Sequence, residues 1–280
     1  MKSIFQIIIF TLVPFLGFCE TVLVSIPPHK YFVEKIADDS INVLLLLPPG
    51  GSPHSYEPNA RQILDSAKAD IWFQVGEGFE ERAESALKGH RPDLQVVDLR
   101  DGLDLIRYSE GESFHQCGHA HHCFDPHIWL SPRLAKKQAE KIAQVLSLKF
   151  PEKRLIFQKN LEIFLKKLDQ LDLEITAILK PLENRKIMVS HPAYAYFCRD
   201  YGLTQHSVEF EGKDPTPRQV TDILNEARKY QIKTIFVQVQ HSSKGARLIA
   251  TEVGAKIVDL DPLEEDYLQN MRKIARSFAQ

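Results

Sequence analysis

Segments that read as strands alternate with segments that read as helices along nearly the whole chain, and this alternation constrains the fold more than any other feature. The first half contains strand-like runs separated by helix-like runs: strands at 21–26, 41–47, 71–75 and 94–99, and helices at 30–38, 61–68 and 80–87. Such a pattern predicts an α/β fold with a mostly parallel sheet. The run at 41–47 is apolar at every position except Asn42, which is typical of a parallel strand covered on both faces.

The second half repeats the pattern after a much longer helical stretch. Its expected segments are strands at 186–190, 203–208, 234–239 and 256–260, and helices at 193–200, 217–229, 244–253 and 263–278. A helix from Pro132 to about Leu148 precedes them, followed by a longer one from Pro151 to about Leu179. Apolar residues of the longer helix follow helical spacing along one stripe: Leu161, Phe164, Leu165, Leu168, Leu171, Ile175 and Ile178. This helix would extend roughly 40 Å, which is more than one sheet layer requires.

We therefore predict an α/β fold of two lobes with mostly parallel sheets, joined by one long helix. The expected divisions are an N-terminal lobe at 20–150, the linking helix at 151–181 and a C-terminal lobe at 182–280. The formal net charge is only -2 at pH 7. A chain without an excess of positive charge is a poor candidate for binding nucleic acid.

The first 19 residues read as an export signal. Met1–Lys2 gives a basic start, and the nearly continuous apolar run 4–18 is shorter than the about 20 residues that a membrane span needs. Cleavage before Glu20 would release a periplasmic protein. Alternatively, Cys19 ends a stretch that resembles a bacterial lipoprotein box, although Phe18 stands where a small residue is expected. An uncleaved membrane anchor is the third possibility, and every route places the protein outside the cytoplasmic membrane.

Three histidines and one aspartate stand where predicted strands end or where helices begin. His54 lies in the loop after strand 41–47, His127 precedes the helix that opens at Pro132, and His191 directly follows strand 186–190. Open α/β sheets place ligands at the carboxyl ends of their strands. Imidazole nitrogens suit zinc. These positions therefore predict a metal site.

A carboxylate is expected to complete the coordination shell of this metal site. Asp261 follows strand 256–260 and is our preferred fourth ligand, since a carboxylate oxygen can close a tetrahedral zinc site. Asp259 is the alternative, because it shares a strand face with Asp261 if the strand continues. His29 and His241 also lie near strand ends and are lower-ranked candidates.

A second metal-binding candidate lies in the long loop at 100–126. Loops of this length inside compact domains are uncommon and often functional, and short tracts rich in histidine and cysteine bind metals. The tract holds two cysteines, Cys117 and Cys123, which could form a disulfide or join in holding metal. Cys198 reads as a small buried hydrophobe. The histidines of the tract are His115, His119, His121 and His122.

Four motifs resemble the signatures of a known family. The stretches Gly50–Pro58 (GGSPHSYEP), Asp125–Pro132 (DPHIWLSP), Ser190–Tyr194 (SHPAY) and Leu260–Leu263 (LDPL) closely resemble those of the metal-binding receptors of bacterial zinc and manganese ABC transporters. The chain looks most like the ZnuA-like zinc receptors, and the resemblance covers essentially the whole mature chain. One departure is Ser52, where family members often carry an acidic residue near the first ligand.

The resemblance implies a metal held between two lobes, with His54 and His127 from the first and His191 and Asp261 from the second. Manganese-selective relatives typically place a carboxylate at the position of His191, so a third imidazole there favours zinc. Manganese and iron (Mn2+ or Fe2+) are the alternatives. The resemblance also implies a His-rich loop that gathers zinc, and delivery to the membrane permease and ATPase subunits of an ABC transporter. We expect a monomer. Glu57 could orient His54 through a hydrogen bond.

A zinc-dependent hydrolase is the competing function. A catalytic zinc normally has three protein ligands, an open position for water and a general base. The chain has no His-Glu-x-x-His motif, and a fourth ligand is available to close the site. These features favour binding over catalysis. A surface adhesin, a role sometimes assigned to this family, would not conflict with metal binding.

Overall fold

The computed structural model describes residues 20–107, 124–209, 215–241 and 243–280. The predicted export signal at 1–19 lies outside the described residues. So do the loop residues expected to bind metal or to pair as a disulfide: His115, Cys117, His119, His121, His122 and Cys123.

The first sheet is parallel throughout and has the strand order β2-β1-β3-β4. Its strands are β1 (Thr21–Val24), β2 (Asn42–Leu45), β3 (Ile71–Gln74) and β4 (Gln95–Asp98). Its helices are α1 (Pro27–Ala37), α2 (Ala60–Ser66) and α3 (Gly78–His90). In the central register, Val22 pairs with Val43 on one side and with Ile71 on the other. The fully buried strand of this lobe is β1.

The apolar run at 41–47 forms an edge strand, and the prediction that it is covered on both faces is wrong. Within β2, Asn42 is exposed, and Val43, Leu44 and Leu45 are only partly buried. The strand pairs with β1 on one side and has no described partner on the other. A mostly apolar run indicates a strand but does not reveal the position of that strand in the sheet.

The second sheet repeats the architecture with the order β6-β5-β7-β8, again parallel. Its strands are β5 (Lys186–Val189), β6 (Thr204–Ser207), β7 (Thr234–Gln238) and β8 (Lys256–Leu260). Its helices are α6 (Ala195–Tyr201), α7 (Pro217–Lys229), α8 (Lys244–Val253) and α9 (Tyr267–Phe278). The chain order switches direction between β5 and β7, so segments that leave those two strands lie side by side.

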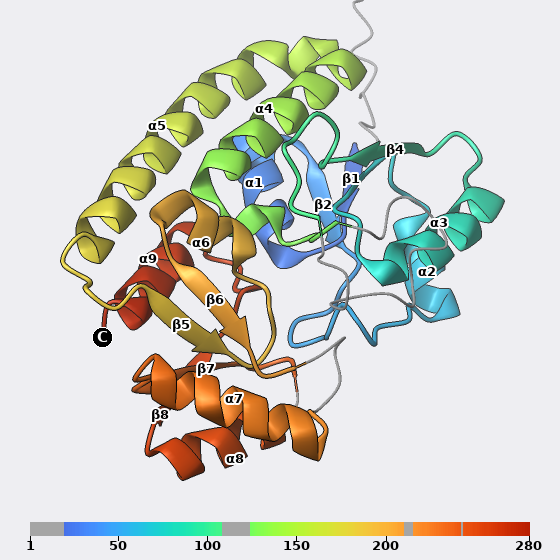
Figure 1. Cartoon of the computed structure of the whole chain (residues 1–280). Helices are drawn as coiled ribbons and strands as arrows, with labels where there is room; N and C mark the ends of the chain where they lie inside the picture. The colour runs from blue at the N-terminus through green and yellow to red at the C-terminus, as the bar shows by residue number, and fades with distance from the viewer. Residues whose placement is uncertain (1–19, 108–123, 210–214, 242) are drawn as a thin grey trace, which may run out of the picture.

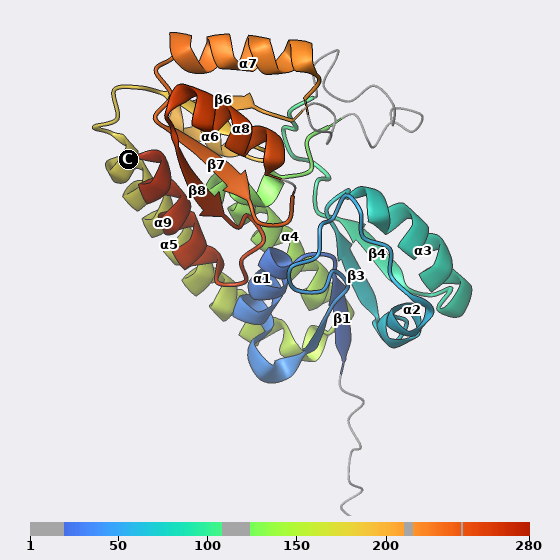
Figure 2. The same cartoon turned by 90° about the horizontal axis from the view of Figure 1, so that it is seen from below.

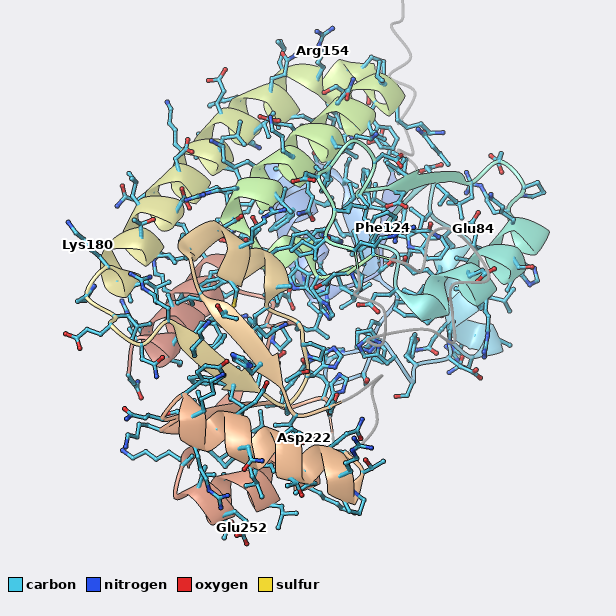
Figure 3. All side chains as sticks on the ribbon, viewed as in Figure 1. Glu84, Phe124, Arg154, Lys180, Asp222 and Glu252 are labelled. Carbon is cyan, nitrogen blue, oxygen red and sulfur yellow. The ribbon has the colours of Figure 1, made fainter. Side chains whose placement is uncertain are left out.

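Two long helices run side by side along one flank of the molecule, at the upper left in Figure 1 and seen from below in Figure 2. They are α4 (Pro132–Lys149) and α5 (Arg154–Leu179), with a short 3-10 turn between them. Figure 3 labels Arg154, the first residue of α5, and Lys180, the residue that follows its last turn. One side of α5 packs against α1 and α4, and its later part packs against α9 of the second lobe. Its buried residues form one stripe: Phe157, Phe164, Leu168, Leu171, Ile175 and Leu179.

One hydrophobic core crosses from the first lobe into the second. It includes residues of β1, α4 and α5 together with residues of β5, α6 and α9. A smaller core lies between the second sheet and the helices α7 and α8. The lobes also share hydrogen bonds: Trp129 Nε1 donates to the carbonyl of Pro262 (2.9 Å), and the Tyr267 hydroxyl donates to the carbonyl of Trp129 (2.8 Å). The two lobes are therefore packed together rather than connected only by a hinge.

Within the described residues, we find no helix with both the length and the apolar character that crossing a membrane requires.

Candidate metal centre

His127 is held rigidly in the first lobe. It precedes the 3-10 turn η3 (Ile128–Leu130) and is almost fully buried. Its Nδ1 lies 2.7 Å from Oδ1 of the buried Asp125, and the same oxygen accepts the backbone N–H of His127 at 2.8 Å. Since Nδ1–H donates to this carboxylate, the proton stays on Nδ1 and Nε2 keeps a lone pair for a metal.

His191 has the same arrangement in the second lobe. It follows β5 and Ser190, and its Nδ1 lies 3.1 Å from Oε2 of Glu209. Both side chains are buried, with 7% and 6% of their surface exposed. A carboxylate at Nδ1 again directs the Nε2 lone pair outward. The second lobe thus presents an oriented imidazole toward the first.

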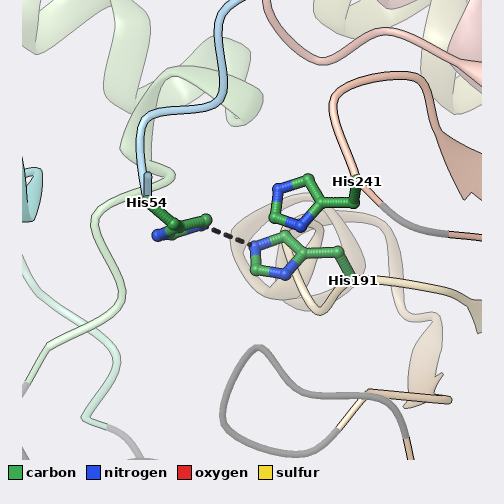
Figure 4. Close-up of side chains that lie close together, drawn as sticks. All are labelled: His54, His191 and His241. Atoms are coloured by element: carbon green, nitrogen blue, oxygen red, sulfur yellow. Dashed lines mark hydrogen bonds between the residues drawn. The ribbon is translucent and has the colours of Figure 1, made fainter. Parts of the chain in front are cut away.

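His54 approaches from the loop between β2 and α2. Its Nε2 lies 3.1 Å from Nε2 of His191, a contact drawn as the dashed line in Figure 4. Tetrahedral zinc with Zn–N bonds of 2.0–2.1 Å separates neighbouring ligand nitrogens by about 3.3 Å, so this pair is spaced as two ligands of one ion would be. The ring of His127 is adjacent, with its centroid 6.2 Å from that of His54 and 5.3 Å from that of His191. The structure therefore brings all three predicted histidines together.

The carboxylate nearest to the other nitrogen of His54 belongs to Glu77, not to Glu57. Oε2 of Glu77 lies 3.9 Å from Nδ1 of His54, whereas Glu57 is exposed and pairs with Arg82. Burial raises the pKa of Glu77 to about 7. Nothing in the sequence singled out Glu77, because only the fold brings the end of β3 beside the loop that follows β2.

Asp261 makes its described hydrogen bonds outside the group of three histidines whose ligand atoms lie closest together. Its Oδ1 accepts hydrogen bonds from Gln240 Nε2 at 2.6 Å and from the backbone N–H of Leu263 at 2.8 Å. Among the described residues, the group of three side chains whose possible ligand atoms all lie within 4.8 Å of one another is His54, His191 and His241. Asp259, the alternative, is exposed on β8. Asp259 belongs to the edge strand β8 and Asp261 directly follows it, one strand away from the point where the sheet switches direction.

His241 was a low-ranked candidate, yet it lies in the cluster. It follows β7, and its ring stacks on that of His191 with centroids 4.2 Å apart and planes 20° apart. Its centroid is 5.2 Å from that of His54. Strand order is the missing signal: β5 and β7 are neighbours in the sheet, so the residues that follow them meet.

The local electrostatics keep most of the cluster neutral. Burial, reinforced by the neighbouring imidazoles, lowers the pKa of His191 well below its usual value and that of His241 to about 4. Burial also acts to lower the pKa of His127, but the charge and hydrogen bond of Asp125 outweigh it and raise that pKa. Metals bind the unprotonated imidazole, so the pKa values of His191 and His241 leave both rings ready to bind at neutral pH.

Two parallel sheets backed by a long helix, with imidazoles from both lobes facing one another, define a metal-binding receptor of the substrate-binding type. Comparison with known proteins identifies the family. Residues 22–280 match the family described as "Zinc-uptake complex component A periplasmic", and the chain belongs to that family.

Individual relatives agree with this assignment. A protein of Chlamydia trachomatis described as metal-binding is 31% identical over 259 residues, which cover 92% of this chain and 90% of that one. The zinc-binding protein AdcA of Streptococcus pyogenes is 28% identical over 90% of this chain and 54% of its own length. A crystal structure of ZnuA superposes with a TM-score of 0.86 and 35% identity, and covers 93% of this chain and 98% of that one.

These findings confirm the predicted resemblance, the fold class and the general function. The chain is a metal-binding, substrate-binding protein of ABC-type zinc uptake, and zinc is its expected cargo. Proteins of this family act outside the cytoplasm, as substrate-binding receptors alongside the permease and ATPase components of the transporter.

Proposed function

We propose that this receptor captures one zinc ion between its lobes with Nε2 of His54, His127 and His191. The observation that carries the proposal is the convergence of these imidazoles from opposite lobes, two of them with Nδ1 against a buried carboxylate. The fourth ligand expected from the sequence, Asp261, stays a prediction.

Zinc is the preferred cargo because the cluster offers nitrogen. Manganese favours carboxylate, carbonyl and water oxygens, whereas zinc binds imidazole well. The acids next to the cluster contact the far nitrogens of the rings: Asp125 lies against His127 and Glu209 against His191. Iron also accepts imidazole, so iron and manganese belong in the same titration.

Binding without catalysis is the activity that the site chemistry supports. A hydrolytic zinc needs an open position for water and a general base beside it. Here a further imidazole, that of His241, stands next to His54 and His191 and is available to close the shell. We propose that the protein is a carrier and not an enzyme.

Delivery and location follow from the same proposal. The export signal at 1–19 would send the protein across the cytoplasmic membrane, with lipid attachment at Cys19 as the alternative route. As a monomer it would present the loaded lobes to the permease, whose ATPase partner drives uptake. The histidines at 115, 119, 121 and 122 would gather zinc and pass it to the site.

Metal titration tests the proposal. The metal-free protein is titrated with Zn2+, Mn2+ and Fe2+, together with a variant in which His54, His127 and His191 are alanine. The same titrations are repeated in a second form of the protein, called the loop background, which carries alanine at the four loop histidines and serine at Cys117 and Cys123. We expect one tight zinc site in the native protein and in the loop background.

Replacing the three histidines should remove that site in both backgrounds. If zinc binds equally well without them, the binding site is elsewhere and the proposal fails. A native protein that prefers manganese would overturn the choice of metal.

A further inference from the structure

We propose that His241 supplies the fourth nitrogen of the zinc shell, in place of Asp261, and that Glu209 positions both His191 and His241 for this role. The inference rests on the proposed zinc capture and concerns the composition of that site.

The stacked rings of the second lobe point the same way. Oε2 of Glu209 lies 3.1 Å from Nδ1 of His191 and 3.7 Å from Nδ1 of His241. With both Nδ1 atoms toward one carboxylate, both Nε2 atoms face the opposite side, where His54 enters from the first lobe (Figure 4). One buried acid thus orients two imidazoles.

The spacing of the ligand atoms fits a shared ion. One nitrogen each from His54, His191 and His241 falls within 4.8 Å of the others. Tetrahedral zinc requires about 3.3 Å between ligand nitrogens, so each pair is at most about 1.5 Å from that spacing. Side-chain adjustment covers such a difference.

His241 also has an unpaired nitrogen that calls for a partner. Only 8% of its side chain is exposed, and its Nε2 is buried without a hydrogen-bond partner among the described residues. A buried polar atom left unpaired destabilises the fold, so it usually has a function or a missing partner. A metal ion on the Nε2 side would satisfy it.

Asp261, in contrast to His241, already has hydrogen-bond partners for its side chain. Its Oδ1 already accepts two hydrogen bonds, one of which fixes the start of the loop after β8 through the N–H of Leu263. To bind metal, the carboxylate would have to give up these contacts or use its other oxygen. Its structural position is that of a loop-forming residue.

Single substitutions distinguish the two candidates. His241→Phe keeps an aromatic ring and removes both nitrogens, and Asp261→Asn keeps the shape and removes the charge. His206→Phe is the matched control: His206 lies in the same lobe, its Nδ1 also contacts a carboxylate (Glu226, 3.1 Å), and its Nε2 is also buried and unpaired, but it is not in the histidine cluster. Glu209→Gln tests the positioning role.

Two measurements are made on the full chain in the loop background, with Zn2+ added at one equivalent. Competition with a chelator gives the zinc affinity, and X-ray absorption at the zinc edge gives the number of imidazole ligands. We expect His241→Phe to weaken zinc binding more than about tenfold and to remove one imidazole from the spectrum. Glu209→Gln should weaken binding by about 10–100-fold, the usual effect of losing a residue that orients a ligand, without changing the imidazole count.

Asp261→Asn and His206→Phe should both stay near the native affinity. If Asp261→Asn weakens zinc binding while His241→Phe leaves the affinity and the imidazole count unchanged, His241 is not a ligand and the inference fails, although zinc capture stands. If the native protein shows no tight zinc site, the proposed function itself fails.

Discussion

Burial alone decides the protonation state of His29. This residue of α1 is fully buried, and its Nε2 lies 2.8 Å from Oε1 of Gln138. Burial lowers its pKa to about 4, even though the hydrogen bond with Gln138 acts in the opposite direction. His29 is therefore a neutral core residue near the junction of the lobes, with its ring beside that of Trp129.

The lowered pKa makes the stability of the metal-free protein depend on pH. The unfolded chain binds a proton at His29 near pH 6.5, and the folded chain only near pH 4, so the contribution of His29 is complete above pH 6.5 and is lost as the pH falls toward 4. The loss amounts to roughly 3 kcal/mol at 1.36 kcal/mol per pKa unit.

Urea unfolding at several pH values measures this effect. His29→Gln should flatten the slope of unfolding free energy between pH 6.5 and 4, and the exposed His90→Gln should leave it unchanged. Equal slopes in the native protein and in His29→Gln would show that other groups cause the acid sensitivity.

At the residue scale, sequence reasoning found part of the candidate site. His54, His127 and His191 were chosen from strand ends and motifs, and the fold brings them together; their role as ligands remains a prediction. His241 and Glu77 were missed or ranked low because their importance depends on which strands are neighbours. That order is a property of the sheet and leaves no mark in a single sequence.

At the element scale, nearly every strand and helix was predicted within a few residues. The largest differences occur at helix starts. The first helix begins at Pro27 rather than Lys30, since proline is tolerated in the first turn. The last begins at Tyr267 rather than Leu263, because Asp261 holds the N–H of Leu263 in a turn. The exact residue at which a helix begins depends on local hydrogen bonds, and hydrophobic periodicity does not predict these.

The buried stripe of α5 gives a stability prediction. Leu168 is fully buried in the shared core, whereas Leu173 on the same helix is 65% exposed. Leu168→Ala should lower the free energy of unfolding by about 2–5 kcal/mol, because it removes buried methyl groups and leaves a cavity. Leu173→Ala should change it by no more than about 0.5 kcal/mol. Chemical denaturation of both variants tests this, and equal losses would mean that α5 is not packed as described.

At the scale of the whole molecule, the shared core limits how far the lobes can separate. Residues from both lobes form one hydrophobic cluster, and hydrogen bonds of Trp129 add links between them. Wide opening would expose this apolar surface to water, at about 25 cal/mol per Å2. Zinc capture should therefore involve small local movements.

Small-angle scattering with and without zinc tests this expectation. For a compact chain of this length the radius of gyration is about 19 Å, and zinc should change it by less than about 1 Å. The melting temperature should nevertheless rise, because a ligand at 100 times its Kd stabilises the folded state by about 2.7 kcal/mol. Compaction by several ångströms would show a hinge that the shared core does not permit.

The unequal exposure of the histidines has a kinetic consequence. The side chain of His54 is 38% exposed, while those of His127, His191 and His241 are nearly covered. Solvent reaches the cluster at the ring that belongs to a loop, the part of a fold that moves most easily. An arriving zinc ion would first exchange its bound water for the imidazole of His54. A departing ion would release His54 last. The rate of exchange would then depend on that loop, and the affinity on the buried rings behind it.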